Sequence, residues 1–256
     1  MSIQLRSVAP APALDRFVQS IWMMENASER DIEATVLPDG MVDLFLVKVG
    51  DGAFRILLKG VDIEPSPIVV EARTKMFAIS LRLPTVEYLL QASVADIVNI
   101  ARVMPEGFWG FGPEDLGDFG RFCRKAVDVV GAAGGKTAHG QVTPADTRKR
   151  ELFDLIYSSN GQMSVKELSE KVFWSSRQIN RYFNQQFGLS LKTYCGILRF
   201  RASFEHIKAG KLFPQENFFD QSHFIKEVKR LSGVLPKDLR QNKNGRFLQF
   251  SALPEG

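Results

Sequence analysis

The sequence predicts an α+β protein, in which a small antiparallel β-barrel or sandwich with accompanying helices precedes an all-α part. Three observations support this prediction. Short runs rich in Val, Ile, Leu and Phe alternate with turn residues in the first third of the 256-residue chain. A segment rich in Gly and small polar residues follows at 131–147. Beyond it, apolar residues recur at helical spacing up to about residue 241.

Composition and charge limit the classes of function. Apolar residues make up 45% of the chain, which is enough to bury a core. No apolar run approaches the ~20 residues of a membrane helix, and no secretion signal is recognisable, so we expect an unexported cytoplasmic protein without membrane contact. Residues 1–148 contain 15 Lys and Arg against 19 Asp and Glu, whereas residues 149–256 contain 18 against 10. This asymmetry favours a sensor or partner domain joined to a domain that binds a polyanion.

The strands are expected first along the chain, at 17–24, 32–37, 42–49, 54–61, 68–71 and 76–83. Pro84 then fits the first turn of a helix that runs to about residue 103. A second helix is expected over 113–130, and its apolar residues recur at intervals of three and four as one stripe. We expect this stripe to serve a dimer interface, with packing on the barrel as the alternative. The stripe consists of Leu116, Phe119, Cys123, Val127 and Val130.

The segment 131–147 is predicted to be a flexible linker, because it lacks apolar periodicity and the sign of the charge changes across it. It divides the chain into a sensor or dimerisation domain at 1–130 and a basic helical domain at 148–256. The helices of the second domain are expected at 148–158, 164–172, 176–187, 191–209, 221–231 and 236–241.

Residues 164–188 are typical of a helix-turn-helix, here called the first unit. Ser164 with Glu167, and Ser175 with Gln178, have the spacing of capping boxes. The helix 176–187 has an apolar face of Ile179, Tyr182, Phe183 and Phe187. Its polar face, predicted to contact DNA bases, consists of Arg177, Asn180, Arg181 and Asn184. Arg can bind guanine, and Asn adenine, through paired hydrogen bonds in the major groove.

A long helix and a second unit (217–233) follow. Nineteen residues at 191–209 would span ~28 Å, which is close to the ~34 Å of one DNA turn. In the second unit, the residues predicted to contact bases are Gln221, Ser222, His223 and Lys226. Phosphate contacts are predicted for Ser176, Lys192, Lys229 and Arg230.

Residues 148–241 resemble the DNA-binding domain of the AraC/XylS family of bacterial transcription regulators. The matching residues are Ser175, 179–183, 187–190, Tyr194, Arg199, 218–224, Lys229, Arg230, Gly233, Pro236, Leu239 and Arg240. The resemblance implies seven helices, with the reading helices 176–187 and 221–231 entering adjacent major grooves. In the first domain, Leu37-Pro38-Asp39-Gly40 followed by Val42-Asp43-Leu44 resembles the cupin-like sensor domain of a subset of these regulators.

The second unit departs from the family pattern. Its connection from Ile207 to Asn217 is shorter, and Pro214 further limits the supporting helix. Asn217 stands where the family has Gly, and Val228 and Lys226 replace Phe and Arg. Because Lys keeps the charge but loses bidentate geometry, we expect this unit to read DNA weakly or mainly to hold phosphates.

Three functions are compatible with these patterns. The leading expectation is a sequence-specific transcription regulator that binds double-stranded DNA and is controlled by an effector or by dimerisation. A small-molecule effector, a homodimer and RNA polymerase are left open as partners. The second is an architectural DNA-binding protein without a ligand. The third is a cupin-type metalloenzyme, but residues 1–130 contain no His, so we expect no catalytic, cofactor or metal residues.

The remaining aromatic and histidine residues have simpler interpretations. Trp22, Trp109 and Phe111 could line a ligand pocket, but large aromatic side chains more often fill a core. His139, His206 and His223 are the only histidines, and the sequence places no thiol or carboxylate cluster around them.

Overall fold

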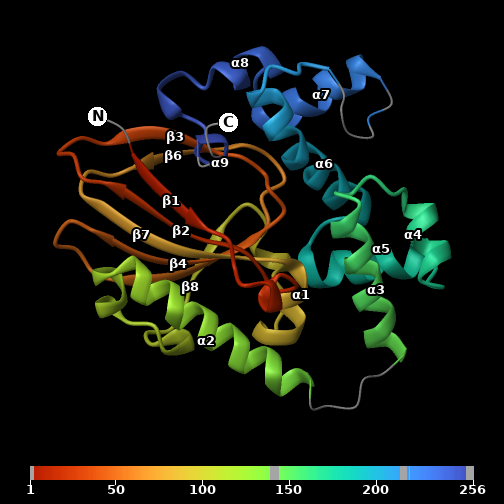
Figure 1. Cartoon of the computed structure of the whole chain (residues 1–256), viewed down its shortest axis with the longest axis horizontal. Helices are drawn as coiled ribbons and strands as arrows, with labels where there is room; N and C mark the ends of the chain where they lie inside the picture. The colour runs from red at the N-terminus through yellow and green to blue at the C-terminus, as the bar shows by residue number, and fades with distance from the viewer. Residues whose placement is uncertain (1–2, 139–143, 214–217, 219, 252–256) are drawn as a thin grey trace.

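The computed structural model covers the whole chain and describes residues 3–138, 144–213, 218 and 220–251. It confirms the predicted α+β class. An antiparallel β part (3–138) precedes a helical part (144–251). Figure 1 shows the strands on the left, the helices of residues 144–208 on the right, the helices of residues 221–241 along the top, and residues 248–251 beside the strands.

Two sheets build the β part. One has the strand order β1-β2-β7-β4-β5-β8, and the other pairs β3 with β6. The bounds are β1 (Gln4–Val8), β2 (Val18–Asn26), β3 (Ile32–Val36), β4 (Val42–Val49), β5 (Arg55–Lys59), β6 (Ser66–Val70), β7 (Thr74–Leu81) and β8 (Ala101–Val103). Alternate residues of β4, namely Val42, Leu44 and Leu46, are fully buried, as a strand with one core face requires.

The helix expected over 84–103 is wrong. The chain instead forms α1 (Leu83–Thr85), a π-turn (Val86–Leu90), a 3₁₀ turn (Ala95–Ile97) and strand β8. Gln91, directly after the π-turn, has a φ of 51°, which ends the helical path. The apolar run after it could not be assigned to helix or strand by periodicity alone.

The helix expected over 113–130 has different bounds. Residues Pro113–Gly117 form a 3₁₀ turn, and α2 runs over Phe119–Ala138. Because α2 continues to Ala138 and α3 (Pro144–Ser158) begins at Pro144, most of the predicted linker 131–147 is helical, and 139–143 lie outside the described residues. Short 3₁₀ turns also occur at Pro12–Leu14 and Phe108–Gly110.

The apolar stripe of α2 packs on the β part, which corrects the dimer expectation. Leu116, Phe119 and Val130 are buried in the main core, and Cys123 and Val127 are half-buried against it. Figure 1 shows α2 lying alongside the large sheet. The stripe is therefore covered within one chain.

The helical part follows the predicted pattern closely. After α3 come α4 (Val165–Lys171), α5 (Ser176–Phe187), α6 (Leu191–Lys208), α7 (Gln221–Ser232) and α8 (Pro236–Gln241). A 3₁₀ turn (Lys243–Gly245) and α9 (Leu248–Ser251) were not expected. No helix in the described ranges is long and apolar enough to cross a membrane.

The C-terminal tail (242–251) leaves the helical part and packs on β3. The Thr35 N–H donates to the Arg246 carbonyl at 2.7 Å, and the Leu37 N–H donates to Gln249 Oε1 at 2.7 Å. The ring of Phe250 lies 5.8 Å from that of Phe204 on α6. The tail, expected to belong to the helical domain alone, therefore contacts both parts.

Candidate nucleic-acid interface

Two capping boxes fix the helices of the first unit, as the sequence predicts. The Glu167 N–H donates to Ser164 Oγ at 3.2 Å, and the Ser164 N–H donates to Glu167 Oε2 at 2.8 Å. Ser175 and Gln178 repeat the arrangement at the start of α5, with distances of 3.3 and 3.1 Å. The hydrogen bonds from Ser164 lower the pKa of Glu167. These caps satisfy backbone donors that a helix start leaves open.

The apolar face of α5 is buried as predicted. Ile179, Phe183 and Phe187 are fully buried, and the Phe183 ring lies 5.8 Å from those of both Phe153 on α3 and Tyr194 on α6. Burial of this face turns the opposite face outward. Its exposed residues are Arg177, Gln178, Arg181, Asn184 and Gln185. Gln185 belongs to this surface although the sequence analysis did not select it.

Asn180 is the exception on the predicted reading face. Its Nδ2 donates to the Ser176 carbonyl at 3.0 Å, and its Oδ1 accepts from the Leu191 N–H at 3.2 Å. The side chain is half-buried and joins α5 to the first residue of α6. Since both ends of the amide are engaged with backbone, a base contact by Asn180, as predicted, would compete with these hydrogen bonds.

The second unit exposes a basic surface on α7. Asp220 caps the helix by accepting from the His223 N–H at 2.7 Å, and Phe224, Val228 and Leu231 are buried. The exposed residues among those predicted to contact DNA are Gln221, Ser222, Lys226, Lys229 and Arg230. His223 is half-buried, with its ring 5.8 Å from that of Phe218, and is less accessible than its neighbours.

Arg230 is already engaged within α7. Its Nε and Nη2 donate to the two carboxylate oxygens of Glu227 at 3.2 and 2.9 Å. These hydrogen bonds lower the pKa of Glu227. A phosphate contact by Arg230, as predicted, therefore competes with this ion pair. Of the other predicted phosphate contacts, Lys192 is exposed in the first turn of α6 and Ser176 is half-buried at the start of α5.

The support for α7 differs from that for α5. The described residues between α6 and α7, which are 209–213, 218 and 220, form no helix. Pro214 and Asn217, which the sequence analysis singled out, lie outside the described residues. The second unit thus depends on packing of α7 against α6 and α8.

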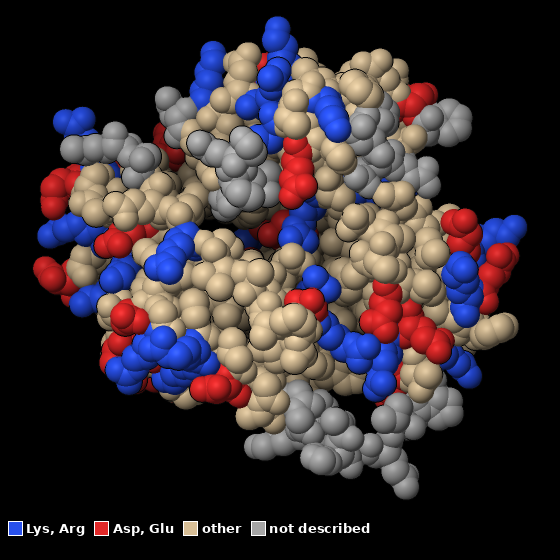
Figure 2. All heavy atoms as spheres, viewed as in Figure 1, with Lys and Arg blue, Asp and Glu red and all other residues tan. Residues whose placement is uncertain are grey.

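Helix α6 separates the two units. Its 18 residues span ~27 Å at 1.5 Å per residue. Figure 1 shows α4 and α5 at one end of α6 and α7 and α8 at the other. In the view of Figure 2, Lys and Arg side chains gather over the α7–α8 end, whereas both signs of charge occur over the α4–α5 end.

Tyrosine hydroxyls attach the helical part to the β part. Tyr182 on α5 donates to Glu87 Oε2 at 2.6 Å. Tyr194 on α6 donates to the Gly40 carbonyl at 3.1 Å, and Tyr157 on α3 accepts from the Leu83 N–H at 3.0 Å. Of these residues, Tyr182 was predicted as part of the apolar face of 176–187 and Tyr194 only as part of the family resemblance, and Tyr157 was not singled out. Tyr instead of Phe at a buried position was the available signal, because a buried hydroxyl needs a partner.

The remaining candidates are dispersed. Within the described ranges, no group of three or more His, Cys, Asp and Glu side chains lies where it could hold a metal ion. His139 lies outside these ranges. Phe111 is fully buried and Trp109 stacks on Phe108 with ring centroids 5.5 Å apart, whereas Trp22 lines a cavity.

Comparisons with known proteins give the following similarities. A family described as "Domain of unknown function (DUF6597)" matches residues 6–104. ToxT of Vibrio cholerae, at 1.65 Å resolution, aligns with a TM-score of 0.42 and 12% identity over 93% of this chain and 97% of ToxT.

Two ligand-bound ToxT structures are similar to the same degree. The complex with (E)-4-(8-methylnaphthalen-1-yl)but-3-enoic acid has a TM-score of 0.43 and 11% identity, over 99% of this chain and 100% of ToxT. The complex with an unsaturated fatty acid has a TM-score of 0.41 and 11% identity, over 93% and 94%. No curated protein sequence matches the chain.

Proposed function

We propose that this chain is a sequence-specific DNA-binding regulator of transcription. The observation that carries the proposal is the arrangement around α6. Helices α5 and α7 each bury an apolar face and expose a polar, basic one, and they lie at opposite ends of a rod whose length approaches one DNA turn. The resemblance of residues 148–241 to the AraC/XylS DNA-binding domain supports the same function.

The side chains have distinct roles in this proposal. Arg177, Arg181 and Asn184 on α5 contact base edges, where Arg pairs with guanine and Asn with adenine. Lys192 and Lys229 contact phosphates and fix the position of the protein on the duplex. On α7, Gln221, Ser222 and Lys226 contact bases or phosphates at a second groove, with His223 contributing less.

The β part controls the helical part in this proposal. Residues 1–130 form the control domain, which is cupin-like by resemblance, and residues 148–256 form the DNA-binding domain. The hydrogen bonds from Tyr182 to Glu87 and from Tyr194 to Gly40 support this, because a shift of either acceptor would move α5 or α6. A small-molecule effector, a second copy of the chain and RNA polymerase are the partners through which such a regulator would act in the cytoplasm.

The test is selection of binding sites from a random duplex pool, followed by fluorescence anisotropy. We expect a selected site to bind at least ~10³-fold tighter than random duplex. Arg181→Ala should lose ~1–3 kcal/mol of binding free energy at that site and relax the preference at one position. Lys192→Ala should weaken binding to every sequence alike and lower the salt dependence.

Lys166→Ala is the matched control, because Lys166 is an exposed α4 residue outside both predicted sets and lies 3.9 Å from Glu170. It should leave affinity and preference unchanged. Equal affinity for all sequences would favour an architectural protein instead. A preference that survives Arg181→Ala unaltered would contradict the assignment of α5.

A further inference from the structure

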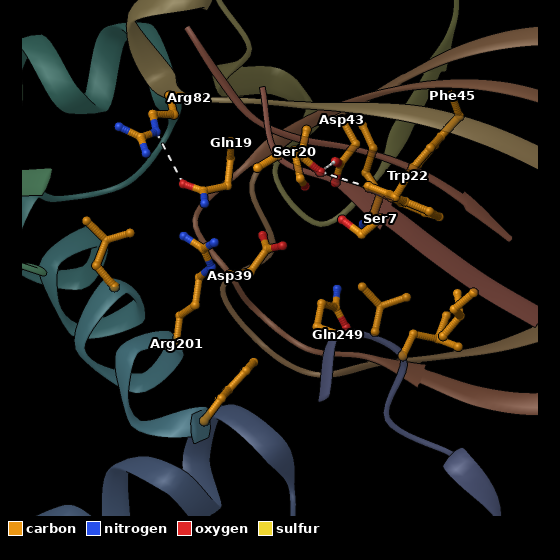
Figure 3. A pocket seen from close by; sticks show the side chains of 18 of the residues that line it. Ser7, Gln19, Ser20, Trp22, Asp39, Asp43, Phe45, Arg82, Arg201 and Gln249 are labelled. Carbon is orange, nitrogen blue, oxygen red and sulfur yellow. Dashed lines mark hydrogen bonds between the residues drawn. The ribbon is translucent and has the colours of Figure 1, made fainter. Parts of the chain in front are cut away.

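A large cavity lies between the β part and α6. Its volume is about 1720 Å³, which exceeds that of common small-molecule pockets. Figure 2 shows an opening near the middle of the displayed face, and Figure 3 shows the walls from close by. The apolar part of the wall includes Trp22, Met24, Val36, Phe45, Met76 and Leu248. Leu248 and Gln249 belong to the C-terminal tail, which thus helps to close the cavity.

Two of the carboxyl groups that line the cavity, Asp39 and Asp43, are half-buried. The others are exposed, namely Asp15, Asp154 and Glu205. Asp43 on β4 accepts from Ser80 Oγ at 2.5 Å, and Ser80 Oγ in turn accepts from Trp22 Nε1 at 2.9 Å. Asp39, in the loop before β4, accepts from the Met41 N–H at 3.0 Å. Among the described residues, neither carboxyl forms a salt bridge with a Lys, Arg or His.

Burial removes water from these two carboxyls, and no salt bridge among the described residues replaces it. Loss of hydration raises the pKa of Asp39. It also raises the pKa of Asp43 to about 8, with the charge of Asp39 adding to the effect. A carboxylate deprived of water is stabilised by a positive partner that reaches it inside the protein.

The basic side chains that line the cavity are mostly engaged elsewhere. Lys59 pairs with Asp62 at 2.5 Å, and Arg16 pairs with Asp154 at 3.2 Å. Arg82 donates to Gln19 and its guanidinium lies 4.8 Å from the centre of the Tyr157 ring. Arg6 lies 5.2 Å from the centre of the Phe119 ring.

Arg201 on α6 is different, because it faces Asp39 from the other side of the cavity. Its charge is the strongest of those that lower the pKa of Asp39, yet the pair forms no salt bridge within 4.0 Å. The two cations whose charge acts on Asp39 are Arg201 and Lys59, and Lys59 is paired with Asp62. Asp39 and Asp43 therefore face one guanidinium, that of Arg201, which is near but not bound. This excess of carboxyl groups over guanidinium groups favours the binding of a positively charged ligand.

We propose that this cavity binds a small organic cation, an amine or guanidinium compound with an apolar body. The charged group lies at Asp39 and Asp43, and the body lies against Trp22 and Phe45, whose ring centroids are 5.7 Å apart. Cations bind favourably over such aromatic faces, most of all over Trp. Charge-assisted hydrogen bonds to the two carboxylates provide the specificity.

The bound cation would also change the contact between the two parts. It competes with Arg201 for Asp39 and so weakens the attraction of α6 for the loop that contains Gly40. Because Gly40 accepts the hydrogen bond from Tyr194, the change reaches α6 directly. This regulation rests on the proposed function, whereas the binding itself does not.

The first test uses the unaltered full chain and three probes with the same eight-carbon chain: octylamine, octanoic acid and octanol. Isothermal titration at about pH 9, where an alkylamine is still protonated and the Asp43 carboxyl is ionised, measures each affinity. We expect octylamine to bind at least about tenfold tighter than the other two. Tighter binding of octanoic acid, or equal binding of all three, would overturn the proposal.

Substitutions in the cavity then show where the charged group of octylamine binds. Asp43→Asn and Asp39→Asn should each weaken octylamine binding about tenfold or more, and Arg201→Gln should strengthen it by removing the competing cation. Asp128→Asn, an exposed carboxyl on α2, is the matched control and should have no effect. Loss of binding in Arg201→Gln would contradict the proposal. The probe comparison decides the question even if a cavity variant does not fold.

DNA anisotropy with and without octylamine separates the two proposals. Specific DNA binding without octylamine binding would refute the cavity proposal alone. Octylamine binding without specific DNA binding would refute the proposed function and leave the cavity site standing. If both hold, octylamine should change the affinity for the selected site, and Asp43→Asn should suppress that change.

Discussion

The two ends of α6 are attached to the rest of the molecule in different ways. At the first unit, Tyr182 is bonded to Glu87, and Gly188 approaches the β part so closely that an added Cβ would lie 2.6 Å from the Ala95 carbonyl oxygen. At the second unit, α7 packs on α6 and α8, and Gly233 lies near Pro65 only at van der Waals distance.

The difference shows which contacts hold α5 and α7 in place. The β part, α3 and two capping boxes position α5, so its exposed Arg and Asn side chains are presented by a rigid support. Helix α7 has one capping residue, Asp220, and an internal ion pair that engages Arg230. We therefore expect the first unit to determine base preference and the second to add mainly phosphate contacts.

The largest expected difference between the units is in stability. Phe183→Ala should lower the free energy of unfolding by about 3–5 kcal/mol, because its ring contacts aromatic residues of α3, α5 and α6. Phe224→Ala should cost less, about 3 kcal/mol, since Phe218 is its only neighbour among the described aromatic rings. Urea unfolding measures both. Equal losses would show that α7 is integrated as firmly as α5.

A smaller effect separates positioning from reading within α5. Asn180→Ala should cost about 1–3 kcal/mol of stability, because the Ser176 carbonyl and the Leu191 N–H lose their partner. It should leave base preference unchanged. Asn184→Ala is the counterpart, with stability within about 0.5 kcal/mol of the parent and an altered preference in site selection. The reverse pattern would restore Asn180 as a base contact.

At the second unit, removal of a charge should strengthen DNA binding. Glu227→Gln breaks the ion pair with Arg230 and leaves the guanidinium available to phosphate. Affinity for random duplex should rise a few-fold, and the salt slope should steepen by about 1. Glu114→Gln removes the same charge from the β part and serves as control. Unchanged binding by Glu227→Gln would mean that α7 does not approach phosphates.

The smallest effect is a pH dependence confined to the first unit. The pKa of Glu167 is lowered by its hydrogen bonds with Ser164, so the capping box contributes above the carboxyl's unfolded pKa and is lost as pH falls through its folded value. Amide exchange at the start of α4 should therefore quicken on acidification. Glu167→Gln should lack this response, and an identical response in that variant would assign the effect to another group.

Sequence patterns predicted the local features well. The ranges expected for α4 to α8 agree with the structure to within a residue or two, because caps and left-handed Gly residues mark their ends. Six strands were placed to within a few residues by apolar runs and turns. Strand β1 (Gln4–Val8) was missed because most of its residues are exposed, so it lacks the alternation that identifies a half-buried strand.

The features that sequence patterns missed depend on contacts between distant residues. The pairing of the tail with Thr35, the bond from Tyr194 to Gly40 and the double engagement of Asn180 join segments whose proximity only the fold creates. The cavity is a further example. Asp39 and Asp43 were noted as part of a resemblance, but nothing in the sequence places Arg201 opposite them.

Methylation interference on a selected site tests the central claim most directly, since it locates contacts to guanine N7 in the major groove. Two clusters of interfering guanines about 10 base pairs apart on one side of the duplex are expected, with the stronger cluster lost in Arg181→Ala. A single cluster, or interference spread evenly over the site, would contradict the claim that α6 presents two units to successive grooves.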